Sequence, residues 1–480
     1  MTPLWNFEAF AAACAGEVHG GGGQPVTGIS IDSRTIAPGE AFFAIKGDRF
    51  DGHDFVAKAF ENGAGVAVVA ADRLAGLGNI VGGKLVIAVD DPLKALQRLG
   101  VASRERSGAK VIAVTGSVGK TGTKEMLRTT LEPSGKVHAS VASFNNHWGV
   151  PLTLARMPAD CDFAVFEIGM NHPGEITPLV AMVHPHVVVI TTVEPVHLAQ
   201  FESVEEIARA KAEIFTGLVP GGAAVLNRDN PHFVFLHHLA VENGITRIVG
   251  FGEDDGAEVH LEKVVLHGGC SCVSATVFGV PVTYKIGVPG RHLVQNSLAV
   301  LASVQLVDAD LAKAAVALAN LQAPKGRGRR HTLTLRDGEA TLIDESYNAN
   351  PTSMRAAIEL LHQTPVGEWG KRIAVLGDML ELGEGAEQFH KGLAEPIAAA
   401  GIDQVFCAGP LMETLWKTLP RSRRGAYSET SGRLEAILAG ALAPGDVVMI
   451  KGSLGSRMGP LVDALLARYG SDPSEAGPEG

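Results

Sequence analysis

The chain has 480 residues, and its 41 basic and 52 acidic side chains give a formal net charge of -11. This acidic balance argues against broad electrostatic binding to nucleic acid or to an anionic membrane surface. No apolar run approaches the roughly 20 residues that cross a bilayer, and residues 1–8 lack the basic start and apolar stretch of a secretory signal. We therefore expect a cytoplasmic protein that neither binds nucleic acid nor inserts into membranes.

Composition and length favour a multi-domain α/β protein. The length corresponds to about three domains, and the hydrophobic fraction of 46% is sufficient for sizeable cores. The 57 glycines, together with only 5% aromatic residues, indicate many tight strand-to-helix turns, which open α/β sheets require. The five cysteines lack the paired spacing of a zinc site, so we expect reduced, mostly buried thiols.

The first stretch, residues 1–109, is predicted to form a small α/β domain. Short apolar segments at residues 41–45 and 66–70 alternate there with helical patterns. Polar residues 103–109 lead out of this domain toward a strand that starts at Lys110.

The central stretch, residues 110–322, begins with a buried strand at 111–115 and a glycine turn, and a helix follows at 121–131. The residues of the strand end and turn are Thr115, Gly116, Ser117, Val118, Gly119, Lys120 and Thr121. Glycines let backbone N–H groups surround phosphate oxygens, while Lys120 reaches the terminal phosphates and Thr121 can ligate Mg²⁺. The strict phosphate-loop pattern expects glycine where Val114 stands, but the strand-turn-helix context supports an ATP site over an ordinary turn with a solvated lysine.

The rest of the central stretch predicts a parallel sheet with an altered edge. Buried strands at 163–168 and 187–193 end in polar residues, and ligands bind at such carboxyl ends. Residues 259–284 are β-rich and glycine-containing, which predicts an antiparallel insertion or edge. A helical stretch at 298–321 closes the domain.

Three further side chains of the central stretch could carry chemistry. Glu167 ends the second strand, where a carboxylate suits Mg²⁺, although solvated acids are equally common at strand ends. His197 follows the third strand, and a lone histidine is more often structural than a ligand. Lys211 lies in an alanine-rich helical pattern, and the residues alone favour an exposed helix lysine.

The third stretch, residues 323–470, is predicted to form a second doubly wound sheet. A basic connector at 324–330 precedes strand runs that alternate with helical patterns. These runs are residues 340–343, 372–376, 404–408 and 447–450. Polar residues 344–350 and 451–453 follow two of the strands, although Asn-Ala-Asn-Pro is also a good helix start. We expect the polar tail, residues 471–480, to be disordered.

Taken together, these motifs resemble the Mur ligase family of ATP-dependent amide-bond enzymes over nearly the whole chain. The motifs that carry the resemblance are residues 115–121, 167–171, 197, 211–213, 347–351 and 451–453. The resemblance implies an α/β architecture of three domains: a small N-terminal α/β domain (1–109), a central P-loop, ATPase-like domain with a parallel sheet (110–322), and a C-terminal Rossmann-like domain (323–470).

Within the family, the chain is most similar to the branch that adds D-alanyl-D-alanine to UDP-N-acetylmuramoyl-tripeptide in peptidoglycan precursor synthesis. Residues 377–383 with His390 resemble the carboxyl-terminal signature of that branch. The branch that adds the third amino acid often has Asp-Asn-Pro-Arg in its last domain. Here Asp-Asn-Pro stands at 229–231, in the central stretch, and His232 follows it.

The resemblance implies roles for the central residues. Lys120 and its loop would bind ATP phosphates, Thr121 and Glu167 would hold Mg²⁺, and His197 would serve a second Mg²⁺. Lys211 matches a lysine that several Mur ligases carry as a carbamate. Carbamylation makes physical sense there, because it replaces a cation that would repel the metal with an anion.

Further roles are implied for nucleotide and substrate binding. Asn296 would lie near adenine, Arg327 would approach the nucleotide from the domain junction, and Asp344 would approach it from the third domain. Arg329 and Arg330 stay open as alternatives to Arg327 for the phosphate contact. The implied substrate-binding residues are Ser33, Arg34, Lys46, Asn145, Asn146, Tyr347, Asn348, Asn350, Lys451 and Ser453.

The implied reaction forms an acyl phosphate from ATP and a carboxylate, which the amine of the dipeptide then converts to an amide. Because an acyl phosphate hydrolyses in open water, we expect the third domain to close over the second about residues 324–330. We also expect the protein to be a monomer. Two other functions stay open at this point: a small-molecule kinase using the same loop, and a non-catalytic nucleotide-sensing scaffold.

Overall fold

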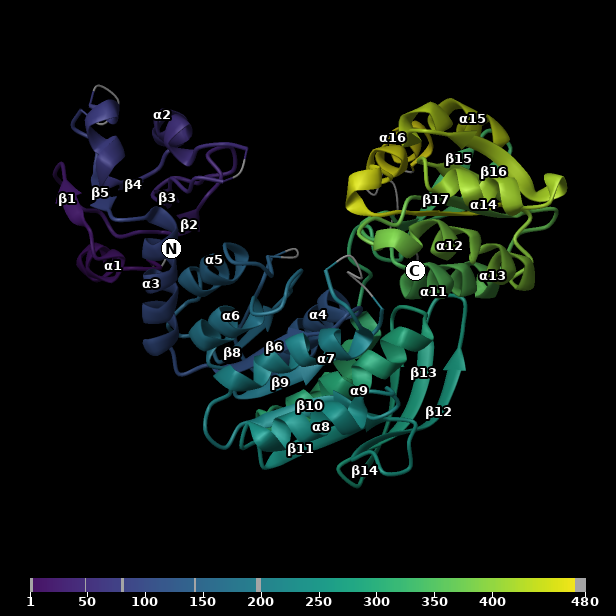
Figure 1. Ribbon diagram of the computed structural model, residues 1–480, viewed down its shortest axis with the longest axis horizontal. Helices are drawn as coiled ribbons and strands as arrows, with labels where there is room; N and C mark the ends of the chain where they lie inside the picture. Colours follow the sequence, from purple (N-terminus) through teal and green to yellow (C-terminus); the bar gives the residue numbers. More distant parts are fainter. Residues whose placement is uncertain (1–2, 48, 79–81, 142–143, 196–199, 471–480) are drawn as a thin grey trace, which may run out of the picture.

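The computed structural model describes residues 3–470 apart from 48, 79–81, 142–143 and 196–199. The predicted disordered tail and His197 therefore lie outside the described residues. Figure 1 shows three lobes, with the central lobe between the N-terminal and C-terminal ones. Of the described helices, none combines the length and apolar character needed to cross a membrane.

The N-terminal lobe holds a five-stranded sheet in the order β1-β5-β4-β3-β2, parallel except for β1. Its elements are α1 (Phe7–Cys14), β1 (Glu17–His19), β2 (Ile29–Ser30), β3 (Ala41–Phe43), α2 (Val56–Glu61), β4 (Val66–Ala70), β5 (Val86–Val89) and α3 (Pro92–Glu105). Helix α3 begins well because Asp91 accepts hydrogen bonds from two backbone N–H groups and Pro92 needs no partner of its own. It runs on through the first part of the predicted polar exit at 103–109.

The central lobe holds a nine-stranded sheet in the order β14-β13-β12-β11-β10-β9-β6-β8-β7. Its strands are β6 (Lys110–Thr115), β7 (Val137–Ala139), β8 (Phe163–Glu167), β9 (Val187–Ile190), β10 (Ala223–Asn227), β11 (Arg247–Gly252), β12 (Val259–Leu266), β13 (Ser271–Val277) and β14 (Val280–Ile286). Its helices are α4 (Lys120–Leu131), α5 (Gly149–Ala155), α6 (Ile176–Val183), α7 (Val204–Ala212), α8 (Phe233–Glu242), α9 (Arg291–Leu306) and α10 (Leu311–Ala317).

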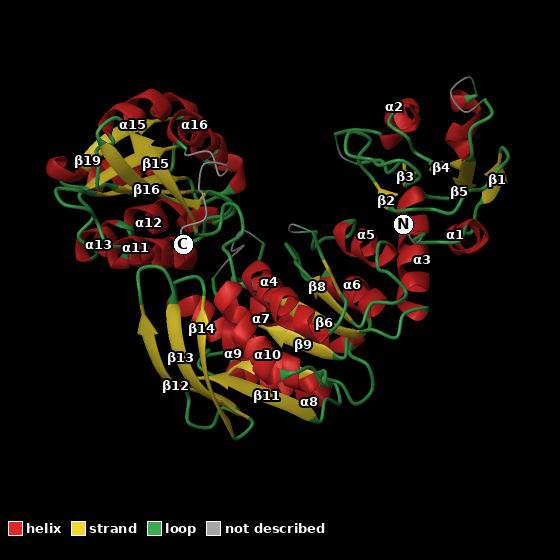
Figure 2. Cartoon of the chain, turned by 180° about the vertical axis from the view of Figure 1, so that it is seen from behind, coloured by secondary structure: helices red, strands yellow, loops and turns green. Residues whose placement is uncertain are grey.

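Both faces of this sheet are covered, as its strand sequences predict. Val111 and Ala113 of β6 pack into one core, whereas Ile112 and Val114 pack into the other, because successive side chains of a strand point to opposite faces. Strands β12, β13 and β14 pair antiparallel, which confirms the predicted antiparallel edge. In Figure 2 this edge extends toward the C-terminal lobe.

The C-terminal lobe has a six-stranded sheet in the order β15-β16-β20-β17-β18-β19, parallel except for the β15–β16 pair. Its strands are β15 (Arg329–Leu335), β16 (Gly338–Glu345), β17 (Arg372–Gly377), β18 (Gln404–Ala408), β19 (Arg424–Ser428) and β20 (Val447–Lys451). Its helices are α11 (Pro351–Gln363), α12 (Ala386–Lys391), α13 (Ala394–Ala399), α14 (Met412–Thr418), α15 (Glu435–Ala441) and α16 (Gly459–Tyr469), and they cover both faces (Figure 2).

Two predicted elements were wrong in their extent. The single helical stretch predicted at 298–321 is α9 followed by α10, because Asp308 takes a left-handed backbone conformation and Asp310 caps the new helix. The third strand ends at Ile190 rather than at residue 193. Beyond it, the Thr191 hydroxyl donates to the Val118 carbonyl at 2.6 Å, so this segment belongs to the loop rim and not to the sheet.

Candidate active site

A cavity of about 650 Å³ lies between the central and C-terminal lobes. Its volume is in the range of small-molecule sites. The predicted residues that line it are Ser117, Val118, Gly119, Lys120, Thr121, Asn145, Glu167, Asn296, Arg327, Tyr347, Asn348, Asn350 and Lys451. The fold thus brings together motifs that are spread over more than half of the sequence.

Two glycines shape the turn between β6 and α4. Gly116 has φ 147° and Gly119 has φ 90°, which are conformations that favour glycine. A Cβ at Gly116 would stand 2.0 Å from the Thr191 hydroxyl, and one at Gly119 would stand 2.6 Å from the Asn296 amide nitrogen. The turn therefore lies directly against the end of β9 and the start of α9, and a larger residue would displace it.

Lys120 folds back over this turn. Its Nζ donates to the Gly116 carbonyl at 2.7 Å. Burial lowers the pKa of Lys120, the charge of Glu167 opposes this effect, and the charge of Arg327 adds to it. Lys120 and Arg327 come from different lobes, so two cations face the same space from opposite sides, as a polyphosphate requires.

Thr121 and Glu167 form the centre of a possible magnesium site. The Thr121 hydroxyl donates to Glu167 Oε2 at 2.9 Å, and Asn145 Nδ2 donates to Oε1 at 2.7 Å. In the described part of the chain, no group of three or more His, Cys, Asp or Glu side chains is arranged to hold a metal ion. One carboxylate beside a hydroxyl nevertheless fits Mg²⁺, which keeps several waters and takes further oxygens from phosphates.

Lys211 differs from the prediction made from its residues alone. Its side chain is only 2% exposed, so the interpretation as an exposed helix lysine is wrong. It follows buried Ile207 by four residues, and this helical spacing could have placed it on the buried face. Burial, followed by the charge of Lys120, holds the pKa of Lys211 well below its usual range. Among the described residues, Lys211 has no hydrogen-bond or ion-pair partner, which suits an amine that reacts with CO₂.

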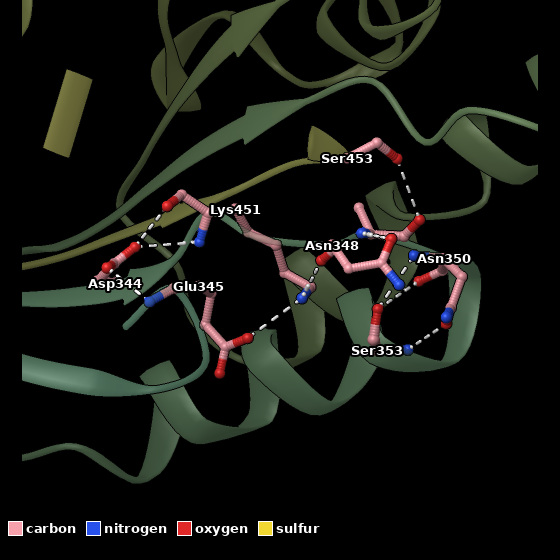
Figure 3. A network of polar contacts seen from close by, with 10 residues as sticks. Asp344, Glu345, Asn348, Asn350, Ser353, Lys451 and Ser453 are labelled. Atoms are coloured by element: carbon pink, nitrogen blue, oxygen red, sulfur yellow. Dashed lines mark hydrogen bonds and ion pairs between the residues drawn. The ribbon is translucent and has the colours of Figure 1, made fainter. Parts of the chain in front are cut away.

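The C-terminal side of the cavity is a network of hydrogen bonds (Figure 3). Lys451 is 2% exposed, and its Nζ donates to Glu345 Oε2 at 3.2 Å and to the Asn348 carbonyl at 2.9 Å. Ser453 donates to the Ala349 carbonyl. Asn350 caps α11 in a capping box with Ser353. The polar cluster is therefore both a helix start and a cavity wall.

The connector contributes Arg327 to the cavity. Of the three arginines considered, only Arg327 is among the cavity-lining residues, and its guanidinium lies 4.4 Å from the Tyr347 ring centroid. Arg330 instead donates to the Thr364 hydroxyl. Asp344 does not line the cavity: it is fully buried and accepts from Gly326 N at 2.8 Å and from the Ser346 hydroxyl at 2.6 Å. In this structure Asp344 shapes the connector.

Other predicted residues lie away from this cavity. Arg34 is 84% exposed and pairs with Asp32 at 2.7 Å, and Lys46 is also exposed, whereas Ser33 is buried. All three belong to the N-terminal lobe. Asn146 accepts from Gly149 N at 3.0 Å at the start of α5, and Ser453 is likewise absent from the lining residues.

The cavity also has lining residues that no motif indicated. They include Thr191, Thr192 and Asn227. Most of them follow the carboxyl end of a strand, so their places in the parallel sheets were the available signal.

Three family models match consecutive parts of the chain: "Mur ligase family, catalytic domain" at residues 25–114, "Mur ligase middle domain" at 114–304 and "Mur ligase, glutamate ligase domain" at 328–454. A UDP-N-acetylmuramoyl-tripeptide--D-alanyl-D-alanine ligase of Bacillus subtilis (strain 168) is 36% identical over 92% of this chain and 93% of its own length. The chain belongs to the Mur ligase family. The family and its three-domain α/β architecture, both expected from the motifs, are confirmed.

Other Mur ligases are also similar along most of the chain. The Escherichia coli (strain K12) enzyme of the same name is 35% identical over 79% of this chain and 81% of its own length. The crystal structure of MurF from Acinetobacter baumannii superposes with a TM-score of 0.82 at 30% identity. The match covers 97% of this chain and 100% of that one. MurF ligase of Thermotoga maritima, solved in complex with ADP, gives a TM-score of 0.73 at 26% identity, over 92% of this chain and 98% of that one.

Proposed function

We infer that this Mur ligase joins D-alanyl-D-alanine to UDP-N-acetylmuramoyl-tripeptide, with ATP as the energy source, in peptidoglycan precursor synthesis. The observation that carries the inference is the cavity of about 650 Å³ that the two lobes share. The phosphate loop lines it on the central side, and Arg327 and Lys451 line it on the C-terminal side. The activity named for relatives that match along most of this chain supports the same function.

The first step activates a carboxylate. The terminal carboxylate of the UDP-tripeptide attacks the γ-phosphorus of ATP, the bond to the β-γ bridging oxygen breaks, and ADP leaves as an acyl phosphate forms. Charge spreads over the transferring phosphoryl oxygens in this step, and preorganised donors stabilise it. Lys120, the backbone N–H groups of the loop and Arg327 are placed to supply them.

The second step forms the amide. The free amine of the dipeptide attacks the acyl carbon, inorganic phosphate leaves, and the nitrogen loses a proton. The residues that we propose to hold the dipeptide lie on the C-terminal wall, at Tyr347, Asn348 and Asn350. Because this wall belongs to another lobe, amine and acyl phosphate meet only where the two lobes face each other.

Thr121 and Glu167 would hold Mg²⁺, which neutralises charge between phosphate oxygens when it is bound. We propose that Lys211 carries a carbamate that supports this charge balance, with His197 at a second Mg²⁺ and Asn296 near adenine. The N-terminal lobe would hold the uridine nucleotide through Ser33, Arg34 and Lys46, with Asn145 and Asn146 toward the peptide.

Mass spectrometry of the reaction products tests this function. Incubation with ATP, Mg²⁺, UDP-N-acetylmuramoyl-tripeptide and D-alanyl-D-alanine should give the UDP-pentapeptide together with ADP and phosphate. Omitting the dipeptide should stop sustained phosphate release, which separates a ligase from a kinase or simple ATPase. Phosphate transfer to another acceptor without amide formation, or absence of nucleotide binding, would contradict the proposal.

A further inference from the structure

Lys124 is a buried cation that the reaction described above does not use. It lies on α4 one turn after Lys120, and its side chain is 0% exposed. Burial of an ammonium group is costly unless the charge is paired and its N–H groups are hydrogen-bonded. Lys124 Nζ lies 2.8 Å from Glu125 Oε1 and donates to the Ser140 carbonyl at 2.7 Å. These two contacts offset the free-energy cost of burying the Lys124 ammonium group.

The Ser140 end of this contact leads to Glu167. Ser140 follows β7, its N–H donates to the Val165 carbonyl at 3.3 Å, and its hydroxyl accepts from Glu167 N at 3.4 Å. Ser140 thus contacts β8 through both its backbone N–H and its side-chain hydroxyl. Through its carbonyl, Lys124 links the phosphate-loop helix to the end of β8, where Glu167 stands.

Asn145 contacts the same carboxylate. Asn145 Nδ2 donates to Glu167 Oε1 at 2.7 Å, and the Asn145 carbonyl accepts from Gly169 N at 2.8 Å. A Cβ at Gly169 would stand 2.9 Å from Asn145 Cγ, so the side chain and the backbone fit without space between them. Glu167 is therefore held on one oxygen by Thr121 of α4 and on the other by Asn145.

We propose that Lys124 is a positioning residue for the magnesium carboxylate. It ties α4 to Ser140, and Ser140 in turn contacts the end of β8, so that Glu167 stays between Thr121 of α4 and Asn145. Glu125 balances the Lys124 charge, and its second oxygen accepts from Arg128 at 3.0 Å, which holds the Glu125 carboxylate in place. This role rests on the proposed ligase function, and it adds a residue outside the cavity lining to the metal site.

A double-mutant cycle tests the role. Product formation is followed as a function of Mg²⁺ concentration at saturating ATP. As a readout independent of turnover, the dissociation constant of Mg²⁺ in the presence of ADP is measured by titration calorimetry for the wild type, Lys124→Met, Asn145→Ala and the double variant. We expect Lys124→Met and Asn145→Ala each to raise it about 10-fold, the order seen for residues that orient metal ligands. In the Lys124→Met background, Asn145→Ala should add only about 2-fold, because Glu167 has already lost its position.

The comparison separates positioning from general stability. A change that only loosens the fold would give independent, multiplicative effects of about 10-fold each, and that result would overturn the proposal. Lys313→Met, on an exposed lysine of the same lobe, is the matched control and should change nothing. If Lys124→Met does not fold, Lys124→Gln, which keeps an N–H donor, enters the same cycle. A wild type that makes no amide would instead defeat the proposed function.

Discussion

Lys120 and Lys211 lie close enough for the charge of Lys120 to act on Lys211. Burial lowers the pKa of both. Lys120 has the Gly116 carbonyl as an acceptor and can retain its charge beside a phosphate, whereas Lys211 lacks any described partner and is further disfavoured as a cation by Lys120. We therefore propose that the same residue type contacts phosphate at one position and provides the amine that reacts with CO₂ at the other.

Replacing Lys120 with alanine should lower turnover by at least about 10²-fold, comparable to removal of one preorganised transition-state donor. Steady-state product formation measures the loss, and thermal unfolding verifies that the variant folds. Lys313→Ala, on a lysine that is 59% exposed, is the matched control. Near-normal turnover in a folded Lys120→Ala variant would remove Lys120 from the phosphate site.

Lys211→Ala should lose activity that short carboxylic acids such as formate or acetate partly restore, because a free carboxylate can take the place of the carbamate. Product formation is measured over a titration of each acid. Lys120→Ala should not respond to the acids, since it lacks a cation and not an anion. Full activity of Lys211→Ala without any acid would reject the carbamate.

At the scale of elements, the β6–β9 register places the loop beside the end of β9. His186, just before β9, helps to fix this register, because its Nδ1 accepts a hydrogen bond from Val111 N of β6 at 2.9 Å. Burial lowers the pKa of His186 to about 4, and the charges of Arg104 and Lys110 act in the same direction. The neutral imidazole is therefore part of the folded sheet.

Acid should weaken this sheet. Unfolded histidine has a pKa of about 6.5, so the unfolded state takes up a proton before the folded state does. Above pH 6.5, neutral His186 makes its full contribution to the free energy of unfolding, and this contribution is lost as the pH falls toward 4. It amounts to at most about 3 kcal/mol, and solvent screening reduces it. His186→Asn keeps an acceptor that does not titrate, so its unfolding midpoint should fall less than that of the wild type between pH 7 and 4. Exposed His238→Asn should behave like the wild type, and identical pH profiles for all three would contradict the assignment.

At the scale of the whole molecule, we expect closure of the C-terminal lobe to depend on the connector. Gly326 has φ 76°, its N–H donates to Asp344, and a Cβ there would stand 2.8 Å from Tyr347 Cβ. One direct contact already joins the lobes near the cavity, from the Thr352 hydroxyl to Glu194 Oε2 at 3.4 Å. We expect the connector to act as the hinge that brings the two walls together.

Gly326→Ala should lower turnover by about 10-fold, because a left-handed alanine costs roughly 1–2 kcal/mol and the hinge must shift. Small-angle scattering should show the wild type contracting when a non-hydrolysable ATP analogue and the UDP-tripeptide are added, and the variant contracting less. Gly432→Ala, where nothing lies within 4 Å, is the control in the same lobe. Equal contraction and equal turnover would place the hinge elsewhere.

Local sequence determined the strand, glycine turn and helix at the ATP site, most of the strands, and the family. These features depend on residues adjacent in the chain: β6, the positive-φ glycines and α4 follow one another directly. The antiparallel edge could also be predicted from the sequence, because β-rich runs separated by glycines can form few structures other than antiparallel strand pairs.

Only the tertiary structure decided which polar groups meet and which are buried. Thr121 contacts Glu167 across 46 residues of sequence, Arg327 rather than Arg330 reaches the cavity, and Asp344 turns inward to the connector. Burial of Lys211 likewise depends on what packs against α7. Such contacts arise from the packing of distant elements, and a residue's neighbours along the chain do not contain that information.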